Sequence, residues 1–232
     1  MSALGGRAAV VTGASRGIGA AIAVALWGAG ARVIRIARSI AEGFHDGFHD
    51  VPCDLGDPAA LERAAARILA DHGPPEVVVS NAGLFLLKAL EATTPAELDA
   101  QIALNLRAPF HLARALLPPM RGAGRGVFVT IGSIVDHAPF ADNAAYAATK
   151  YAVRGLHETL TAEYRGSGVR LSLVSPGPTD TAVWDPVRPD ERAGFIRRAD
   201  MLRPADVAEA VLFVVTRPPH VHIDWLRINP AS

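Results

Sequence analysis

Residues 12–19 read Thr12-Gly13-Ala14-Ser15-Arg16-Gly17-Ile18-Gly19, a glycine-rich turn between two different elements. The apolar run Ala8 to Thr12 before it predicts a buried β-strand, and the uncharged stretch Gly17 to Trp27 after it predicts a helix. Glycines in such a turn let the backbone approach a pyrophosphate, and free N–H groups at the helix start point at its negative charge. The spacing Gly-x-x-x-Gly-x-Gly differs from the commoner Gly-x-Gly-x-x-Gly, so the prediction of a dinucleotide site rests on the strand-turn-helix context. A flexible turn without a ligand is the alternative.

The same alternation of short β-branched runs and longer Ala- and Leu-rich stretches continues along the whole chain. Strands are predicted at Ala8 to Thr12, Arg32 to Ile36, Phe48 to Cys53, Glu76 to Ser80, Gly126 to Ile131, Arg170 to Val174 and His222 to Ile228. Helices are predicted at Gly17 to Trp27, Pro58 to Asp71, Pro95 to Leu117, Ala144 to Arg165 and Pro204 to Thr216. We therefore expect one α/β domain over residues 1–232, built on a doubly wound parallel sheet. Only Ala37 to Gly47 separates the second and third strands, so a short turn or stub helix is expected there.

Length and composition exclude several classes of protein. The chain has 232 residues, of which 50% are hydrophobic, so one domain with a sizeable core is expected. Lys plus Arg and Asp plus Glu both number 23, which leaves no basic excess for nucleic-acid binding. No apolar stretch reaches the roughly 18 residues that span a bilayer, and the N-terminus lacks a secretory signal pattern. With Cys53 as the single cysteine and hence no internal disulfide, we expect a cytoplasmic protein without nucleic-acid or membrane partners.

Four polar residues are candidates for catalysis. Tyr146 and Lys150 stand at i and i+4 on a predicted helix and so share one face, although a simple helix-surface contact has the same spacing. Ser133 follows a predicted strand and should emerge at its carboxyl end, where open α/β sheets place ligands; capping a turn is its alternative. Asn105 lies in an apolar part of a predicted helix, which indicates a buried amide with a defined partner, either catalytic or purely structural.

These residues occur together with other short motifs in the order and spacing of a known family. The motifs are Thr12 to Gly19, Asn81-Ala82-Gly83, Asn105, Ser133, Tyr146 with Lys150, and Pro176-Gly177 with Thr181. On them the chain, from Gly6 to about Pro230, resembles the short-chain dehydrogenase/reductase family. The resemblance implies a single-domain Rossmann-type sheet of strand order 3-2-1-4-5-6-7 with helices on both faces. It also implies a nicotinamide cofactor and an enzyme that interconverts an alcohol and a carbonyl. The chain departs from the family at Ser80, where Asn is usual, and in a shortened segment before Asp54.

The resemblance further implies which residues meet the cofactor. They are Gly13, Ser15, Arg16, Gly17, Ile18, Gly19, Arg38, Asp54, Leu55, Asn81, Ala82, Gly83, Tyr146, Lys150, Pro176, Gly177, Thr179 and Thr181. Within this set, Asp54 is expected at the adenine end, Asn81 at the sheet centre and Thr181 at the nicotinamide.

The catalytic residues implied by the resemblance are Asn105, Ser133, Tyr146 and Lys150. Tyr146 is expected to act as general acid in reduction and general base in oxidation, and Ser133 to orient and polarise the substrate oxygen. An ammonium about 4 Å away can lower the pKa of a tyrosine by about three units, so we expect Lys150 to bring Tyr146 near neutral pH as well as bind the ribose. Asn105 is expected to hold a water against Lys150.

Basic residues near the turn favour NADP(H) over NAD(H). The second predicted strand ends Arg35-Ile36-Ala37-Arg38-Ser39, without the acidic residue that binds a free ribose 2′-hydroxyl and repels a phosphate. Arg16 and Arg38 can both converge on a 2′-phosphate, and NADP(H)-preferring members of the family carry basic residues at these positions. Two surface arginines, with NAD(H) as the cofactor, are the alternative.

Two hypotheses of other classes stay open. A non-catalytic sensor or regulatory protein on the same fold would bind the cofactor without turnover, although it could then lose any of the four catalytic residues. A metal site is conceivable in Phe44-His45-Asp46-Gly47-Phe48-His49-Asp50, but a solvated loop explains the same residues, so we predict no metal.

The substrate and the assembly are predicted in outline. The loops expected around the carbonyl, at 84–87, 135–140 and 183–184, are apolar, with Asp136 and His137 as candidate polar contacts, which favours a small, mainly hydrophobic or mixed-polarity ketone. Residues 181–203 are expected to form a short lid. The helices Pro95 to Leu117 and Ala144 to Arg165 have Ala-rich, lightly charged outer faces, so we expect a homotetramer or homodimer.

Overall fold

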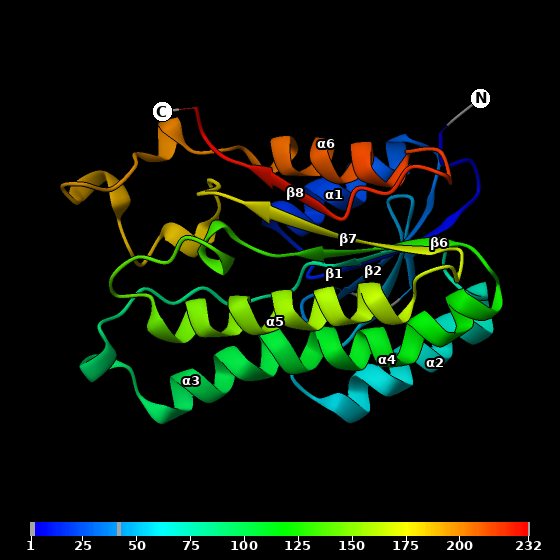
Figure 1. Ribbon diagram of the computed structural model, residues 1–232, viewed down its shortest axis with the longest axis horizontal. Helices are drawn as coiled ribbons and strands as arrows, with labels where there is room; N and C mark the ends of the chain where they lie inside the picture. The colour runs from blue at the N-terminus through cyan, green and yellow to red at the C-terminus, as the bar shows by residue number, and fades with distance from the viewer. Residues whose placement is uncertain (1–2, 41–42, 232) are drawn as a thin grey trace.

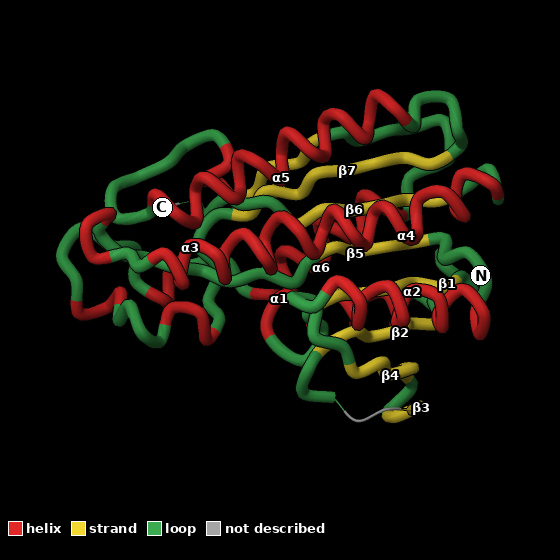
Figure 2. The backbone as a smooth tube through the Cα atoms, turned by 90° about the horizontal axis from the view of Figure 1, so that it is seen from below, coloured by secondary structure: helices red, strands yellow, loops and turns green. Residues whose placement is uncertain are grey.

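The computed structural model describes residues 3–40 and 43–231, and its centre is one twisted sheet. The parallel strands are β1 (Ala8–Thr12), β2 (Arg32–Ala37), β4 (Phe48–Pro52), β5 (Val77–Ser80), β6 (Gly126–Ile131), β7 (Val169–Pro176) and β8 (Trp225–Ile228). Their order in the sheet is β4-β2-β1-β5-β6-β7-β8, which Figure 2 shows for the strands from β4 to β7. This order confirms the predicted Rossmann-type arrangement 3-2-1-4-5-6-7.

Helices cover both faces of the sheet (Figures 1 and 2). One face carries α1 (Gly17–Gly28) and α6 (Pro204–Val215), and the other carries α2 (Pro58–His72), α3 (Pro95–Ile102), α4 (Ala108–Gly122) and α5 (Ala144–Glu163). Successive strand residues point to opposite faces, so Val10 packs in the core beneath α2 and α4 while Val11 packs in the core beneath α1 and α6. Across the described ranges, none of the helices is both long and apolar enough to span a membrane.

The connection between β2 and β4 differs from the prediction. An additional strand, β3 (Gly43–His45), pairs antiparallel with β4 at the edge of the sheet. Of the two expected alternatives, a short turn or a stub helix, the structure has a turn at 38–39, and the helix is wrong. Asp46 and Gly47 close this hairpin with φ values of 51° and 86°. Asp-Gly is a strong hairpin signal because a tight turn of this kind needs positive φ at both central residues. The hairpin brings the chain back beside β2 without a crossover helix.

The long helix predicted at Pro95 to Leu117 is interrupted. A single π-helical turn, η2 (Ala103–Arg107), separates α3 from α4. Thr94 and Glu97 start α3 with a reciprocal capping box, in which the Thr94 side chain accepts from the Glu97 N–H at 3.2 Å. Such π-turns are frequent at functional sites, and this one carries Asn105, which is 1% exposed.

Candidate active site

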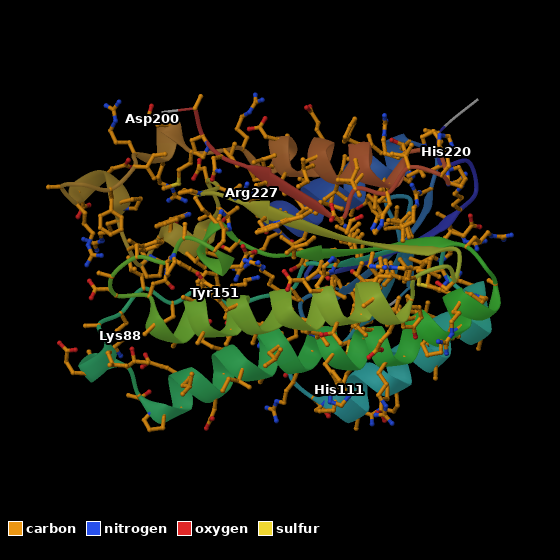
Figure 3. All side chains as sticks on the ribbon, in the orientation of Figure 1. Lys88, His111, Tyr151, Asp200, His220 and Arg227 are labelled. Atoms are coloured by element: carbon orange, nitrogen blue, oxygen red, sulfur yellow. The ribbon has the colours of Figure 1, made fainter. Side chains whose placement is uncertain are left out.

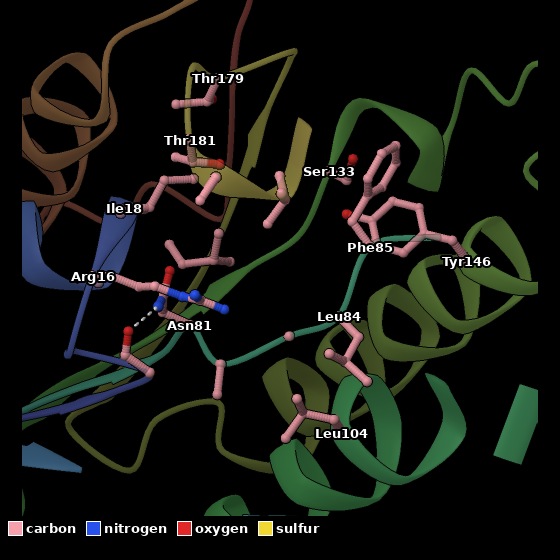
Figure 4. A pocket seen from close by; sticks show the side chains of 18 of the residues that line it. Arg16, Ile18, Asn81, Leu84, Phe85, Leu104, Ser133, Tyr146, Thr179 and Thr181 are labelled. Atoms are coloured by element: carbon pink, nitrogen blue, oxygen red, sulfur yellow. Dashed lines mark hydrogen bonds between the residues drawn. The ribbon is translucent and has the colours of Figure 1, made fainter. Parts of the chain in front are cut away.

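A pocket of about 750 Å³ lies at the carboxyl ends of the central strands (Figure 4). The residue directly after each of six neighbouring parallel strands lines it: Gly13, Arg38, Cys53, Asn81, Gly132 and Gly177. The other predicted residues that line it are Ser15, Arg16, Gly17, Ile18, Gly19, Asp54, Leu55, Ala82, Gly83, Ser133, Tyr146, Lys150, Pro176, Thr179 and Thr181. Of the predicted catalytic and cofactor-binding residues, Asn105 is therefore the one that does not line the pocket. The volume of the pocket suits a ligand site, since such pockets measure about 300–1,000 Å³.

The glycine turn has the geometry that an anion site requires. Gly13 has φ of +66°, and a Cβ on Gly19 would collide with the Gly13 carbonyl oxygen and lie 2.5 Å from Asn81 Nδ2. Arg16 is the N-cap of α1 but provides no side-chain cap, and no acidic residue stands in the first turn. The first N–H groups of the helix therefore keep their hydrogen-bonding capacity and the positive end of its dipole. These residues fit the pyrophosphate of a dinucleotide.

Thr12 and Asn81 lock the turn to the neighbouring strand. Asn81 Nδ2 donates to the Thr12 carbonyl at 2.9 Å. In return, Thr12 Oγ1 accepts from the backbone N–H groups of Asn81 at 2.9 Å and Ala82 at 3.1 Å. The ends of β1 and β5 are thus held together directly beside the pocket.

Ser133 and Tyr146 meet in the opposite part of the pocket (Figure 4). Ser133 follows β6, Tyr146 lies in the first turn of α5, and both side chains line the pocket. Lys150, one helical turn later, is 6% exposed, and its Nζ donates to the Ile131 carbonyl at 3.0 Å. The same Nζ lies 5.7 Å from the centre of the Tyr146 ring. The three candidate catalytic residues are therefore brought together as predicted.

The acid–base properties of this group differ from the prediction. Burial raises the pKa of Tyr146 to about 12, although the hydrogen bond from Ser133 acts in the opposite direction. Burial lowers the pKa of Lys150 to about 8, while the charge of Asp136 raises it. The expected lowering of the Tyr146 pKa by Lys150 is wrong for this arrangement, because the ammonium faces the Ile131 carbonyl and burial disfavours the phenolate.

Asn105 fixes the chain that borders the pocket. Its Oδ1 accepts from the Leu84 N–H at 2.8 Å, and its Nδ2 donates to the Leu84 carbonyl at 2.9 Å. Nδ2 also contacts Gln101 Oε1 at 2.8 Å and Thr149 Oγ1 at 3.1 Å. The side chain thus ties the segment after β5 to η2 and α5, and its function with a water stays a prediction.

Asp136 is a site residue whose function sequence reasoning missed. Neither Asp136 nor His137 lines the pocket, so the expectation that they contact the substrate is wrong. The fully buried Asp136 carboxylate accepts from Ser175 Oγ at 2.6 Å and from the Ser133 N–H at 3.2 Å, and lies 2.7 Å from His137 Nδ1. Trp225 Nε1 in turn donates to Ser175 Oγ at 2.9 Å. The Ser-x-x-Asp spacing of a capping box was the available signal. Asp136 therefore holds the turn that presents Ser133.

The arginines near the adenine end fall into two groups. Arg35 is engaged by Asp50 through two contacts of 2.7 Å. Arg16 and Arg38, in contrast, are exposed, line the pocket, and form no ion pair within the described part of the chain. Asp54 lines the same end and accepts from the Gly56 N–H at 3.0 Å. Two unpaired guanidinium groups are thus available to a ligand.

The hypothetical metal site gains no support. Asp50 is occupied by Arg35, and the His49 ring packs against His72 at 4.8 Å. The side chain of His45 lies outside the described residues. Among the residues described, no three His, Cys, Asp or Glu side chains come together as a metal-binding group.

Comparison with known proteins points to one family. The family model described as short chain dehydrogenase matches residues 7–192. An uncharacterized oxidoreductase of Staphylococcus aureus (strain MRSA252) is 30% identical over 240 residues, which covers 99% of this chain and 100% of the relative. A counterpart from Staphylococcus aureus (strain USA300) is 31% identical over 237 residues, with the same coverage.

Two solved structures extend this likeness to the fold. A metagenomic short-chain oxidoreductase in complex with NADP has a TM-score of 0.82 and 35% identity, with full coverage of both chains. The closed form of serine dehydrogenase complexed with NADP+ has a TM-score of 0.86 and 27% identity, with 96% of this chain and 94% of that chain covered.

Proposed function

The chain belongs to the short-chain dehydrogenase family of oxidoreductases acting with nicotinamide dinucleotides, and from this premise we propose an NADP(H)-dependent enzyme that interconverts a carbonyl and a secondary alcohol on a small molecule. The observation that carries the proposal is the convergence of two sets of groups in one pocket. The anion-binding turn of α1 lies at one side, and the hydroxyl groups of Ser133 and Tyr146 lie at the other. A dinucleotide held by the turn would bring its nicotinamide toward these hydroxyls.

Residues of this chain then bind the substrate oxygen and transfer a proton to it. Ser133, fixed through its N–H by Asp136, hydrogen-bonds the substrate oxygen, and Tyr146 transfers its hydroxyl proton to that oxygen during reduction. With a pKa of about 12, Tyr146 stays protonated at neutral pH, as a proton donor must be. The cofactor, when bound, supplies or accepts the hydride. Lys150 stands one helical turn behind Tyr146 as a cation that supports proton transfer and binds the ribose.

NADP(H) is the cofactor we propose, with NAD(H) as the alternative. Arg16 and Arg38 support it, because both line the pocket without an ion pair to any described residue. Guanidinium groups bind phosphate through charge and paired donors. The metagenomic relative, solved with NADP, is consistent with this choice.

We propose residues 181–203 as a lid within a single domain. Thr181 and Trp184 of this segment line the pocket. Arg198 braces the segment from within, since it contacts Asp180 and Asp185 at 2.7 Å each and the Thr181 carbonyl at 2.8 Å.

The test is turnover combined with removal of one hydroxyl. Purified protein with NADPH and a panel of ketones should consume the reduced cofactor, as its absorbance reports. Tyr146→Phe should lower kcat by about 100-fold or more while NADPH binding, followed by cofactor fluorescence, changes little. Tyr164→Phe, which removes the hydroxyl of a buried tyrosine outside the pocket, is the matched control.

Each outcome separates the hypotheses. Turnover of Tyr146→Phe within a few-fold of the wild type would contradict the catalytic assignment. Tight NADPH binding without turnover of any ketone would favour the non-catalytic sensor over the enzyme.

A further inference from the structure

Three of the four charged side chains that line the pocket, among the described residues, lie away from the reacting hydroxyls. The four are Arg16, Arg38, Asp54 and Lys150. The first three follow β1, β2 and β4, whereas Ser133 and Tyr146 come from β6 and α5 on the other side of the sheet centre. Lys150 is buried and held by the Ile131 carbonyl. Apart from the buried Lys150, which we propose to bind the cofactor ribose, the described lining residues around Ser133 and Tyr146 therefore offer no ionic partner to a carboxylate, a phosphate or an ammonium group.

Aromatic rings form a continuous wall at this region. The Phe85 ring stands edge-on to Tyr146, with centroids 5.1 Å apart and planes at 88° (Figure 4). The same ring packs against Trp184, at 4.9 Å and 48°. Phe85 comes from the segment after β5 and Trp184 from the lid, so both flank the position where the substrate carbonyl must meet Tyr146. Aromatic pairs prefer these offset and edge-to-face arrangements, and a further ring can extend the stack.

The rim of the region exposes apolar side chains. Leu84, Phe140 and Val183 are 36%, 44% and 43% exposed, and all three line the pocket. Grouped apolar exposure of this kind marks a surface that a ligand covers. The polar atoms left near the carbonyl position are hydroxyls, because Asp136 is fully buried and engaged by Ser133 and Ser175.

We infer that the substrate is an uncharged ketone with an aromatic ring adjacent to the carbonyl, and that Phe85 and Trp184 determine this specificity. The inference rests on the proposed carbonyl–alcohol reaction and deepens it. A charged group brought into this region would lose water without gaining a partner, which is strongly unfavourable. A zwitterionic amino acid or a hydroxy acid is therefore excluded as the preferred substrate.

Two ketones of matched shape test the charge requirement in the wild-type protein with NADPH. 4-Methylacetophenone and 4-acetylbenzoate differ by a methyl group in place of a carboxylate, and kcat/KM should favour the neutral ketone by about 100-fold. Val183→Arg adds a cation at the exposed rim, so this ratio should narrow by about tenfold or more. Equal kcat/KM values for the two ketones would overturn the inference while leaving the proposed reaction in place.

A second pair tests the aromatic wall. The kcat/KM for acetophenone should exceed that for cyclohexyl methyl ketone by about threefold to tenfold. This factor corresponds to the interaction energy of an aromatic pair in addition to the effect of burying its area. Phe85→Leu should raise KM for acetophenone by about fivefold or more and change KM for the cyclohexyl ketone much less. Phe213→Leu, on α6 outside the pocket, is the matched control. Equal KM changes for both ketones in Phe85→Leu would overturn the assignment of Phe85.

Failure of the reaction is distinguishable from failure of the inference. If no ketone is turned over, binding to the NADPH complex is measured by ligand-observed NMR. Binding of 4-methylacetophenone about 100-fold tighter than 4-acetylbenzoate would then support the inference although the proposed function had failed. Absence of that preference would overturn both.

Discussion

Burial shifts the pKa values of the two central titratable residues in opposite directions. The pKa of Tyr146 rises to about 12 and the pKa of Lys150 falls to about 8, because surroundings of low dielectric constant disfavour the charged form of each side chain. The tyrosine therefore remains a proton donor at every ordinary pH, and the lysine is the group whose charge changes near neutrality. The negative charge of Asp136 raises both pKa values, so it adds to the effect of burial on Tyr146 and opposes the effect of burial on Lys150.

The pH dependence of ketone reduction follows from Lys150. Below pH 8 the ammonium is present, and above pH 8 it is lost as the side chain releases its proton. If the ammonium supports proton transfer from Tyr146, kcat/KM should be flat below about pH 8 and fall by up to about tenfold per unit above it. Initial rates measured in buffers of constant ionic strength give the profile. A profile that stays level to two units above 8 would contradict a function for the charged lysine.

Cofactor choice is the second property of single residues. Arg38→Asp replaces a cation that is free for a ligand by an anion at the end of β2. A charge-assisted contact is worth about 1.5–3 kcal/mol, so the Kd of NADPH should rise by about tenfold or more and that of NADH by less. Arg32→Asp, an exposed arginine at the start of the same strand and outside the pocket, is the matched control. Equal losses for both cofactors, measured by fluorescence titration, would contradict a 2′-phosphate contact.

The residues that local sequence can identify are those whose position follows from one element. Tyr146 and Lys150 share a helix face. Gly13 directly follows β1, and Ser133 comes two residues after the end of β6. The function of Asp136 could not be assigned in the same way, because its hydrogen-bond partner Ser175 comes from β7, which is distant in the sequence. The function of a buried carboxylate depends on the groups that hydrogen-bond to it, and these are known only from the fold.

Among the elements, those with a clear apolar period were predicted almost to the residue. β1 and β6 match their expected bounds, and each parallel strand lies at its expected place. β3 was missed because a strand of three residues has no measurable period, although Asp46-Gly47 marked its turn. The π-turn at Ala103–Arg107 was missed because it preserves the helical pattern of apolar residues while changing the hydrogen bonding.

Helix α5 also carries a titratable group that affects stability. His157 is 5% exposed, its Nδ1 has no partner among the described residues, and burial lowers its pKa to about 4. The unfolded chain, with an ordinary histidine pKa near 6.5, binds the proton first as pH falls. The free energy of unfolding should therefore drop as pH falls from about 6.5 to 4, by about 2 kcal/mol at pH 5.

Urea unfolding at about pH 7.5 and pH 5 measures this loss. His157→Gln should lose less stability between the two pH values than the wild type, because glutamine does not titrate. His220→Gln, at an exposed histidine labelled in Figure 3, should keep the loss of the wild type. Identical pH dependence in His157→Gln and the wild type would contradict the assignment to His157.

At the scale of the whole molecule, the doubly wound sheet explains why distant motifs meet. Helices cover both faces of the sheet, so the pocket forms at the carboxyl ends of the parallel strands, where the loops that follow β1, β2, β4, β5, β6 and β7 converge. The same layering leaves the outer surfaces of α4 and α5 turned away from the core (Figure 1). On α5 this surface includes the exposed residues Ala144, Ala148, Tyr151, Gly155 and Ala162, and its charges are those of Glu158, which pairs with Arg154, and Glu163.

The small residues of this surface would allow close helix packing and support the proposal of a homodimer or homotetramer in which α4 and α5 pair across a two-fold axis. A Cβ added at Gly155 would have no other atom within 4 Å, so Gly155→Glu should fold normally. In a paired helix, however, the buried carboxylate would be unpartnered, and light scattering should show a shift from the oligomer toward the 24.4 kDa monomer. Gly28→Glu, at an equally open position on α1, should keep the oligomer. A wild-type monomer at micromolar concentration would contradict the assembly, and an intact oligomer in Gly155→Glu would place its interface on other helices.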